Sequence, residues 1–396
     1  GAYLSGGLDS TIITALVNQY SGKKLRTFSV AFTSEDHDER AYQQEAVRFL
    51  QTKHEQMECG YDDIVAAFSD VIWHTEKPVI RTAPAPLFLL SQQVHNAGYK
   101  VVLTGEGADE VLGGYDIYKE AKIRRFLAAQ PQSAHRGQLL RRLYPYQSNL
   151  QKMPDGYLRR FFRATAEDLH DPFFSHMPRW ELTSRLKTFF SHDLKAELAG
   201  HDAIAELFGQ LPVEYFRWDG FSQAQYLETK YLLPGYILSS QGDRVALAHA
   251  VEARHPFLDY RLVEFANALP PRLKMKALHE KYILKRTFGA LLPEPIVERP
   301  KQPYRSPDGR SFFTGLGADY LMQVLAPERI ASDGIFDPWA ISKLIEKFRA
   351  GEAIGVKDDM ALIGILSTQL VLEQFLSNSQ RGGSLCNEHM LNYAVS

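Results

Sequence analysis

The chain has 396 residues, a formal net charge of −2, and hydrophobic and charged contents of 45% and 23%. These values are ordinary for a soluble globular protein, and the near-neutral charge excludes a general attraction to nucleic acid or to an acidic membrane. No apolar run approaches the roughly 20 residues that span a bilayer. The two cysteines, Cys59 and Cys386, form no disulfide framework. We therefore expect a cytoplasmic protein without membrane or nucleic-acid partners, with Cys59 as a buried, small apolar residue.

The first 115 residues alternate between strand-like and helix-like patterns. Residues 2–4 predict a short strand, and residues 11–17 predict the helix that follows it. Further strands are predicted at 25–32, 54–59 and 100–103, and further helices at 39–51, 63–73 and 85–96. Strands that alternate with helices form a parallel sheet covered on both faces. The predicted fold class is therefore α/β, a parallel sheet sandwiched by helices, and ligands in such folds bind beyond the carboxyl ends of the strands.

The remainder of the chain is predicted to be mostly helical. The predicted helical segments lie at 223–238, 260–268, 281–291, 313–325, 338–349 and 361–376. We expect a nucleotide-binding core over about 1–115, a helical part over about 116–376, and a polar, disordered tail over 377–396. Lysine and arginine are frequent from 118 to 163. That segment could bind RNA, but the near-neutral total charge favours a solvated helical surface.

The run Ser-Gly-Gly-Leu-Asp-Ser at 5–10 connects the first strand to the first helix. Adjacent glycines permit a sharp turn, and the free N–H groups at a helix start favour phosphate oxygens. Ser5 and Ser10 add hydroxyl donors, and Asp9 can hold a magnesium ion. The P-loop lysine is absent, so this is a different kind of phosphate loop. The alternative is an ordinary Gly-Gly turn, which a six-residue match between a strand and a helix disfavours.

A second glycine-rich loop, residues 104–115, follows the strand predicted at 100–103 and carries three acidic residues. Acids this dense at a strand end are costly unless they meet cations. Asp109 is the natural partner of Asp9 for a magnesium ion, and Glu106 could orient or deprotonate an amine nucleophile. The alternative is a solvated loop followed by an acidic helix start, and alone the loop does not decide between the two.

Three further segments carry charged residues that could serve chemistry. Around 242–259 we expect Glu252 and Asp259 to form a buried ion-pair network that docks the helical part onto the sheet, and Arg254 could face a ligand. Lys281, at a predicted helix start, could stabilise charge on an α-phosphate or an oxyanion, although a helix lysine is usually solvated. The proline-rich basic loop 298–304 could contact phosphates or simply connect helices.

These five segments, in this order over about residues 1–376, resemble the synthetase domain of glutamine-hydrolysing asparagine synthetases, whose pyrophosphate loop cleaves ATP between its α- and β-phosphates. The resemblance implies an adenine-nucleotide α-hydrolase-like fold with ATP and Mg²⁺ as ligands. It implies Asp9 and Asp109 as magnesium ligands, Lys281 as the catalytic lysine and Glu106 as the acid beside the nucleophile. The implied nucleotide contacts come from Leu4, Ser5, Gly6, Gly7, Asp9, Ser10, Val30, Thr104 and Gly105.

The implied reaction is the amidation of aspartate to asparagine through an acyl-adenylate, with release of AMP and pyrophosphate. In the family the ammonia comes from glutamine through an N-terminal glutaminase domain. That domain is missing from this chain, so we expect a fragment that uses free ammonia. Three alternatives stay open: a relative that amidates or cyclises another carboxylate (a peptide, an antibiotic precursor or a surface sugar), a tRNA-modifying enzyme with the same loop, and a non-catalytic binding protein. A homodimer also stays open.

Overall fold

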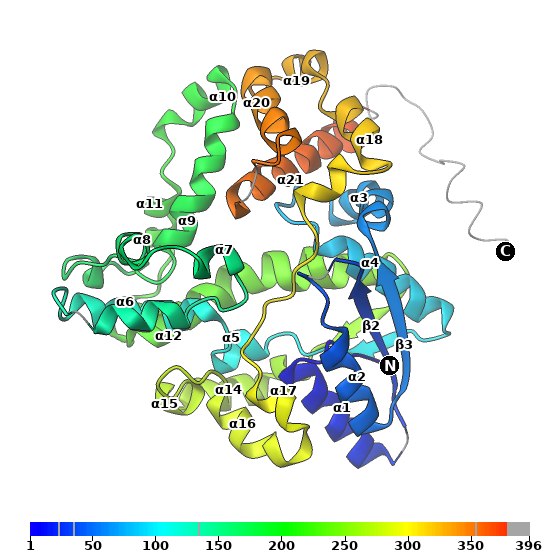
Figure 1. Cartoon of the computed structure of the whole chain (residues 1–396), viewed down its shortest axis with the longest axis vertical. Coiled ribbons are helices and arrows are strands. Elements are labelled where there is room, and N and C mark those ends of the chain that lie inside the picture. The colour runs from blue at the N-terminus through cyan, green and yellow to red at the C-terminus, as the bar shows by residue number, and fades with distance from the viewer. Residues whose placement is uncertain (23, 35, 134, 353–354, 378–396) are drawn as a thin grey trace. The chain divides into compact units, whose positions relative to one another are not determined.

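The computed structural model describes residues 1–22, 24–34, 36–133, 135–352 and 355–377. The tail expected to be disordered, and Cys386 with it, lies almost entirely outside the described residues. The chain divides into two compact units. The first unit contains residues 1–60, 83–185 and 200–307, and the second contains residues 61–82, 186–199 and 308–396. Figure 1 shows the elements in chain order from blue to red.

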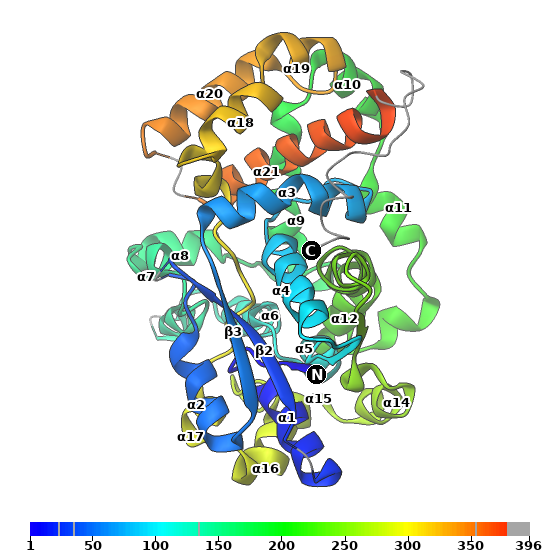
Figure 2. The same cartoon turned by 90° about the vertical axis from the view of Figure 1, so that its right-hand side faces the viewer.

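The first unit contains a parallel sheet, and in the described residues it has five strands in the order β3-β2-β1-β4-β5. The strands are β1 (Ala2–Tyr3), β2 (Arg26–Phe32), β3 (Lys53–Cys59), β4 (Val101–Leu103) and β5 (Glu252–Arg254). In register, Ala2 is paired with Thr27 on one side and with Leu103 on the other. β2 and β3 pair along their whole length and lie side by side in Figure 2. The α/β class is thus confirmed.

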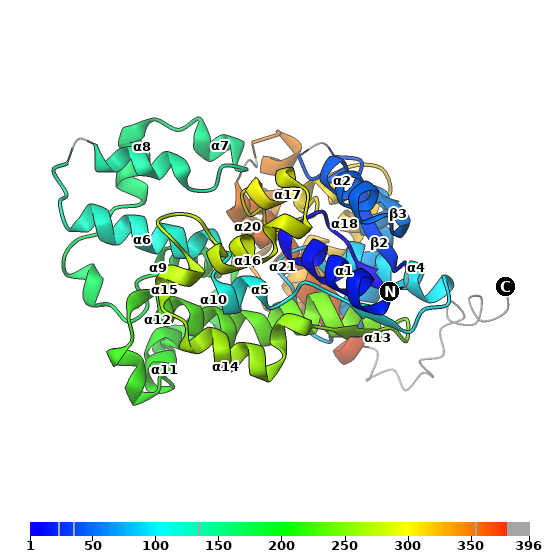
Figure 3. The same cartoon turned by 90° about the horizontal axis from the view of Figure 1, so that it is seen from below.

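Helices cover both faces of this sheet, as the alternation of side chains along β2 shows. Ser29 donates a hydrogen bond to Gln43 of α2 (Arg40–Leu50) at 3.1 Å. Phe28 points to the opposite face, where its ring meets Tyr99, just beyond α4 (Pro84–Asn96), with centroids 5.8 Å apart. The strand is accordingly buried along nearly all of its length, from Thr27 to Phe32. Figure 3 shows α2 close to α1 (Leu8–Ser21).

The rest of the first unit is mostly helical. Its helices are α5 (Ala108–Leu112), α6 (Asp116–Ala128), α7 (Ser148–Gln151), α8 (Asp155–Phe161), α9 (Met177–Ser184), α11 (Ala203–Gly209), α12 (Gly220–Leu227), α13 (Arg244–Leu247), α14 (Tyr260–Ala268), α15 (Pro271–Lys274), α16 (Tyr282–Phe288) and α17 (Glu294–Glu298). A π-helical segment, Glu228–Asp243, continues α12. α6 and α12 pack against each other. The strand β5 was not predicted, because three residues with charged ends carry no strand pattern.

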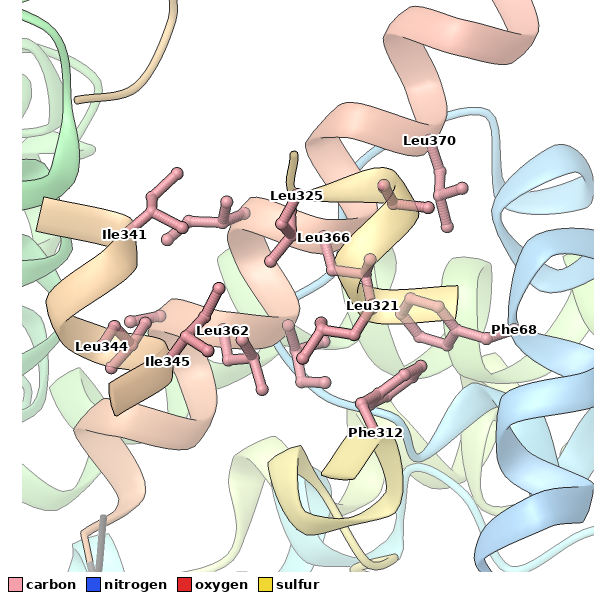
Figure 4. Close-up of a cluster of buried hydrophobic side chains, with 14 of the residues drawn as sticks. Phe68, Phe312, Leu321, Leu325, Ile341, Leu344, Ile345, Leu362, Leu366 and Leu370 are labelled. Atoms are coloured by element: carbon pink, nitrogen blue, oxygen red, sulfur yellow. The ribbon is translucent and has the colours of Figure 1, made fainter. Parts of the chain in front are cut away.

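The second unit is helical within its described residues. It comprises α3 (Tyr61–Thr75), α10 (His192–Glu197), α18 (Gly317–Val324), α19 (Pro327–Asp333), α20 (Pro338–Arg349) and α21 (Val356–Val371). An apolar cluster joins α3, α18, α19, α20 and α21, and Figure 4 shows Phe68, Phe312, Leu321, Leu362 and Leu366 among its side chains. Burial of such side chains is the main stabilising contribution in a unit of this kind.

One segment corrects the expectation about bilayer-length runs. In the described residues, Val356–Leu376 is long and apolar enough to cross a membrane by length and composition alone. Polar residues such as Ser367 and Gln369 interrupt the run, which is why it was missed. Half of its most apolar stretch is buried inside the protein, where Leu362, Leu366 and Leu370 belong to the cluster of Figure 4.

Candidate active site

The loop between β1 and α1 is tightly constrained. Gly6 has φ +72°, and a Cβ there would lie 2.6 Å from the backbone nitrogen of Gln43, so glycine is required for both conformation and space. The Ser5 and Ser10 hydroxyls are 3.1 Å apart, and the Ser5 amide donates to the Ser10 hydroxyl at 3.2 Å. Helix α1 begins directly after Gly7. The loop therefore brings two hydroxyls to a helix N-terminus, as an anion site requires.

The second loop leaves β4, the strand next to β1, and closes against the first loop. A Cβ on Gly105 would lie 2.9 Å from the Cβ of Asp9 and 3.0 Å from the amide nitrogen of Ser10. The Thr104 hydroxyl is 2.7 Å from Nδ1 of His255. Because the carboxyl ends of neighbouring parallel strands meet at one sheet edge, Asp9 and Asp109 come together there. This confirms that both loops lie at one edge of the sheet.

Lys281 joins the two loops from a distant part of the chain. Its ammonium forms ion pairs with Oδ2 of Asp9 and, at 2.6 Å, with Oδ1 of Asp109. The Lys281 side chain is only 2% exposed. An ammonium this deeply buried needs paired charges nearby, and the two carboxylates supply them. The alternative of a solvated helix lysine is therefore wrong.

The backbone at Lys281 is unusual, and a nearby glycine leaves room for the lysine side chain. Lys281 has φ +49°, a left-handed conformation that is uncommon for residues other than glycine and that clusters at functional sites. A Cβ on Gly114 would lie 1.9 Å from Oδ1 of Asp109 and 2.2 Å from Cε of Lys281. The absence of a side chain at Gly114 thus lets the lysine reach the aspartate.

The basic loop 298–304 crosses the same region. Lys301 Nζ lies 2.6 Å from Oδ2 of Asp109. Arg299 forms an ion pair with Glu39 and donates to the Gly6 carbonyl at 3.4 Å. This loop therefore contacts both glycine-rich loops and does more than connect helices. The sequence left Lys301 without a role, because its basic character alone could not distinguish a phosphate contact from a linker.

Burial and pairing set the protonation states of the two aspartates. Burial raises the pKa of Asp9, and the Lys281 ammonium only partly offsets it. Burial alone would also raise the pKa of Asp109, but Lys281 and Lys301 outweigh it and hold that pKa below its usual range. Asp109 is therefore the firmly ionised partner of the two lysines at neutral pH.

Two glutamates of the second loop differ from ordinary surface acids. Burial raises the pKa of Glu106 to about 7, even though part of its side chain remains exposed. Burial also raises the pKa of Glu110 to about 8, and the Tyr115 hydroxyl donates to Oε1 of Glu110 at 2.6 Å. A carboxylate that titrates near neutral pH can accept a proton in a reaction at that pH. Glu106 is suited to this task because it is partly exposed, whereas Glu110 is only 1% exposed and is closed off from a substrate.

The predicted nucleotide-contact residues lie in and around the two loops, with two features that sequence alone could not give. The Leu4 side chain packs with Ala46 and Ile296, so only its backbone remains for a ligand. The Val30 carbonyl accepts a hydrogen bond from Gln43 at 2.8 Å. Their roles as adenosine contacts stay predictions.

Two other expectations about charged residues are wrong. Glu252 is paired with Arg254 at 2.7 Å, but both side chains are more than half exposed, because β5 is an edge strand. Asp259 accepts from the Arg261 amide at 3.0 Å as the N-cap of α14. The basic segment is also not simply a solvated surface, since Lys119 and Arg124 of α6 are both buried.

The carboxylates present fit a magnesium ion. Asp9 and Asp109 both reach a single cation, the Lys281 ammonium, and Oδ1 of Asp9 is buried without a hydrogen-bond partner. Oxygen donors are the ligands that Mg²⁺ prefers, and it is often bound by one or two carboxylates together with substrate phosphates. Over the described ranges, no group of three or more His, Cys, Asp or Glu side chains that could hold a metal ion converges, so the two carboxylates as magnesium ligands stay a prediction.

The sequence profile described as asparagine synthase matches residues 1–373. The chain belongs to the asparagine synthase family. A putative glutamine-hydrolysing asparagine synthetase of Mycobacterium bovis is 29% identical over 364 residues, which are 89% of this chain and 51% of that protein. Asparagine synthetase 1 of Bacillus subtilis, also glutamine-hydrolysing, is 26% identical over 78% of this chain and 46% of its own length.

Not every relative is named as an asparagine synthetase. The amidase chyE of Penicillium rubens is 27% identical over 90% of this chain and 56% of its own length. The chain thus spans about half the length of the curated relatives that it matches. Membership of this family supports an enzyme of the ligase or amidotransferase type, and the relatives' names do not all state the same activity.

Proposed function

We propose that this chain catalyses the ATP-dependent amidation of a carboxylate, with aspartate as the acceptor and asparagine as the product. The observation that carries the proposal is the convergence of Asp9, Asp109 and Lys281 at the carboxyl ends of β1 and β4. Two carboxylates and a buried ammonium beside a constrained anion loop suit the cleavage of ATP between its α- and β-phosphates. Residues 1–376 would form one ligase domain.

In the first step, an oxygen of the aspartate β-carboxylate attacks the α-phosphorus of ATP. The bond from that phosphorus to the bridging oxygen breaks, and pyrophosphate leaves. Ser5, Ser10 and the amides of Gly6 and Gly7 would hold the pyrophosphate. Leu4, Val30, Thr104 and Gly105 would contact the nucleoside and the α-phosphate. Asp9 and Asp109 would hold Mg²⁺, which when bound neutralises phosphate charge.

In the second step, the nitrogen of ammonia attacks the activated carbonyl carbon. A proton passes from nitrogen to Glu106, the bond from carbon to the AMP oxygen breaks, and asparagine and AMP are released. Lys281 lies at the junction of the two loops, where it can stabilise the negative charge that develops on the transferred groups. The pKa of Glu106 near 7 suits a group that accepts a proton at neutral pH.

We further propose that ammonia is derived from glutamine in the complete protein, as the names of the Mycobacterium bovis and Bacillus subtilis relatives state for those proteins. The names do not fix the acceptor, because the Penicillium rubens relative is called an amidase. Amidation of another carboxylate is therefore the second candidate. It would use the same ATP chemistry and a different acceptor pocket.

The test is to identify the amino-acid product. The chain is incubated with ATP, magnesium chloride, ammonium chloride and aspartate, and asparagine is quantified by chromatography. Asparagine that requires ATP, ammonium and aspartate supports the first candidate. If ATP is consumed without asparagine, a panel of other carboxylates with ammonium decides for the second. No amide product from any acceptor in the panel would reject both.

A further inference from the structure

Glu280 is a buried acidic residue that immediately precedes Lys281 and is 5% exposed. Sequence analysis assigned no role to this residue. Its carboxylate Oε1 accepts a hydrogen bond from the backbone amide of Lys301 at 3.2 Å and lies 3.3 Å from Nζ of Lys285. Its Oε2 lies 2.9 Å from Nζ of Lys119 on α6. One carboxylate therefore connects the loop that carries Lys301, helix α6 and the chain that leads into Lys281.

This connection matters because both site lysines depend on loop geometry. Lys281 adopts a left-handed backbone conformation, and Lys301 lies on a proline-rich loop without helical or strand hydrogen bonds of its own at that point. A backbone that is not fixed by regular structure needs side-chain contacts to hold it. The hydrogen bond from the Lys301 amide to Glu280 fixes one loop against the other.

The charge on Glu280 is maintained across the range in which an enzyme works. Burial alone would raise its pKa, but Lys119 and Lys285 outweigh that effect and lower the pKa to about 2. The carboxylate is thus ionised at every pH above about 4, and its contacts to three lysine residues persist. A group that titrated near neutral pH could not hold the loops constantly.

We propose that Glu280 is a positioning residue that holds Lys281 and Lys301 in place over Asp9 and Asp109. It contacts no reacting group, and its effect on the proposed reaction passes through the two lysines. This role rests on the proposed function as far as catalysis is concerned, but the positioning itself can be measured without any turnover.

The competing explanation is that Glu280 only neutralises the buried Lys119. The chain offers a matched control for this, because Oδ1 of Asp116 also lies 3.1 Å from Nζ of Lys119. Asp116, on α6, is buried like Glu280, but it is not a neighbour of either site lysine in the chain, and among the described residues the Lys301 amide donates to Glu280 and not to Asp116. Asp116→Asn therefore weakens the neutralisation of Lys119 and leaves the contact between the loops.

The first experiment measures lysine accessibility in the folded protein. Wild type, Glu280→Gln, Glu280→Ala and Asp116→Asn receive a short pulse of acetic anhydride, and peptide mass spectrometry gives the labelling of each lysine. Lys347 of the second unit serves as the internal reference. We expect labelling of Lys281 and Lys301 to rise severalfold in Glu280→Ala, to rise less in Glu280→Gln, whose amide oxygen can still accept from Lys301, and to stay at the wild-type level in Asp116→Asn.

Wild-type labelling of both lysines in Glu280→Ala would overturn the proposal, as would an equal rise in Asp116→Asn. Circular dichroism shows which variants are folded, and if Glu280→Ala does not fold, Glu280→Gln decides on the same criterion. The second experiment measures steady-state kinetics with ATP, aspartate and ammonium. Displaced lysines should lower kcat about 10-fold in Glu280→Gln, with little change in the KM for aspartate, and Asp116→Asn should keep the wild-type kcat.

The two experiments separate the two proposals. If wild type makes no amide, the proposed function fails and the labelling still decides whether Glu280 holds the lysines. If wild type is active and labelling of Lys281 and Lys301 is unaffected by the loss of Glu280, the positioning role fails and the proposed function stands.

Discussion

The charged site of the first unit and the apolar cluster of the second unit are both buried, but they are built on opposite principles. In the cluster, Leu362 and Leu366 are fully buried among other aliphatic and aromatic side chains. In the site, Lys281 is nearly as deeply buried, but its neighbours are carboxylates, and Oδ1 of Asp9 has no hydrogen-bond partner.

The difference shows which kind of burial needs a functional explanation. Burying an apolar side chain is favourable at about 25 cal/mol per Å². Burying an ion pair seldom adds stability, because the desolvation cost offsets the attraction between the charges. The cluster is thus explained by folding alone. Folding alone does not explain the group formed by Asp9, Asp109 and Lys281, with its left-handed backbone at Lys281, and the proposed ATP site gives those charges a use.

The largest expected effect comes from Asp9→Asn, which should abolish turnover without unfolding the protein. The variant removes one carboxylate from Lys281 and from the proposed magnesium site, while Asp109 remains to pair with the lysine. Amide formation and the melting temperature are measured together. Asp259→Asn, at the partly exposed N-cap of α14, is the control and should remain active. Normal turnover in folded Asp9→Asn would remove Asp9 from the site.

Lys281→Ala should lower kcat by about 10²–10³ while ATP still binds, because the lysine acts on charge that develops during the reaction. Calorimetry gives the affinity for ATP, and amide formation gives kcat. The exposed Lys276, five residues earlier, provides the control variant Lys276→Ala, which should keep the wild-type kcat. A loss of ATP affinity with unchanged kcat would show that Lys281 only binds the substrate.

The pH profile tests the buried acid of the site. Since burial raises the pKa of Glu106 to about 7, the carboxylate becomes available as a base only as the pH rises through 7. We expect kcat to increase from pH 6 to pH 8, and Glu106→Gln to remove most of that increase. If Glu106→Gln kept the wild-type pH profile, the increase in kcat between pH 6 and pH 8 would belong to another group.

The raised pKa of Glu106 also affects stability. At a pH above the pKa of about 4.5 that the residue has in the unfolded chain, burying the ionised carboxylate costs stability, so Glu106→Gln should melt at a higher temperature than wild type at pH 8.

Leu366→Ala should have the smallest effect on turnover and a large one on stability. Loss of a fully buried leucine usually destabilises a protein by about 2–5 kcal/mol through lost contacts and the cavity left behind. Denaturant unfolding followed by circular dichroism measures this, and kcat per folded molecule should stay at the wild-type value. A drop in kcat comparable to that of Lys281→Ala would show that the contrast between cluster and site is wrong.

Sequence reasoning succeeded where local pattern determines structure. The apolar runs of β2 and β4 and the glycine-rich loops that contain Asp9 and Asp109 were predicted, and the rule for parallel strands brought those loops together. Lys281 was a candidate from its place at a predicted helix start, but only the resemblance implied a catalytic role, because its distance along the chain hides its contact with the two loops. Its left-handed backbone could not be foreseen from a lysine at a helix start.

The failures have a common physical cause. Glu252 and Asp259 lie among apolar residues and were expected to be buried, but one lies on an edge strand and the other caps a helix, and both places are solvated. Lys119 and Glu280 were not singled out, because their burial depends on packing between segments about 160 residues apart. Neither kind of environment is encoded in the local sequence.

The most direct test of the account is to quantify the nucleotide products of the wild-type chain with ATP, magnesium chloride, ammonium chloride and aspartate. The arrangement of Asp9, Asp109 and Lys281 around the loop at residues 5–10 predicts AMP and pyrophosphate in equal amounts, formed only when the acceptor is present. Acceptor-dependent release of ADP and phosphate would contradict cleavage at the α-phosphorus, and with it the proposed acyl-adenylate.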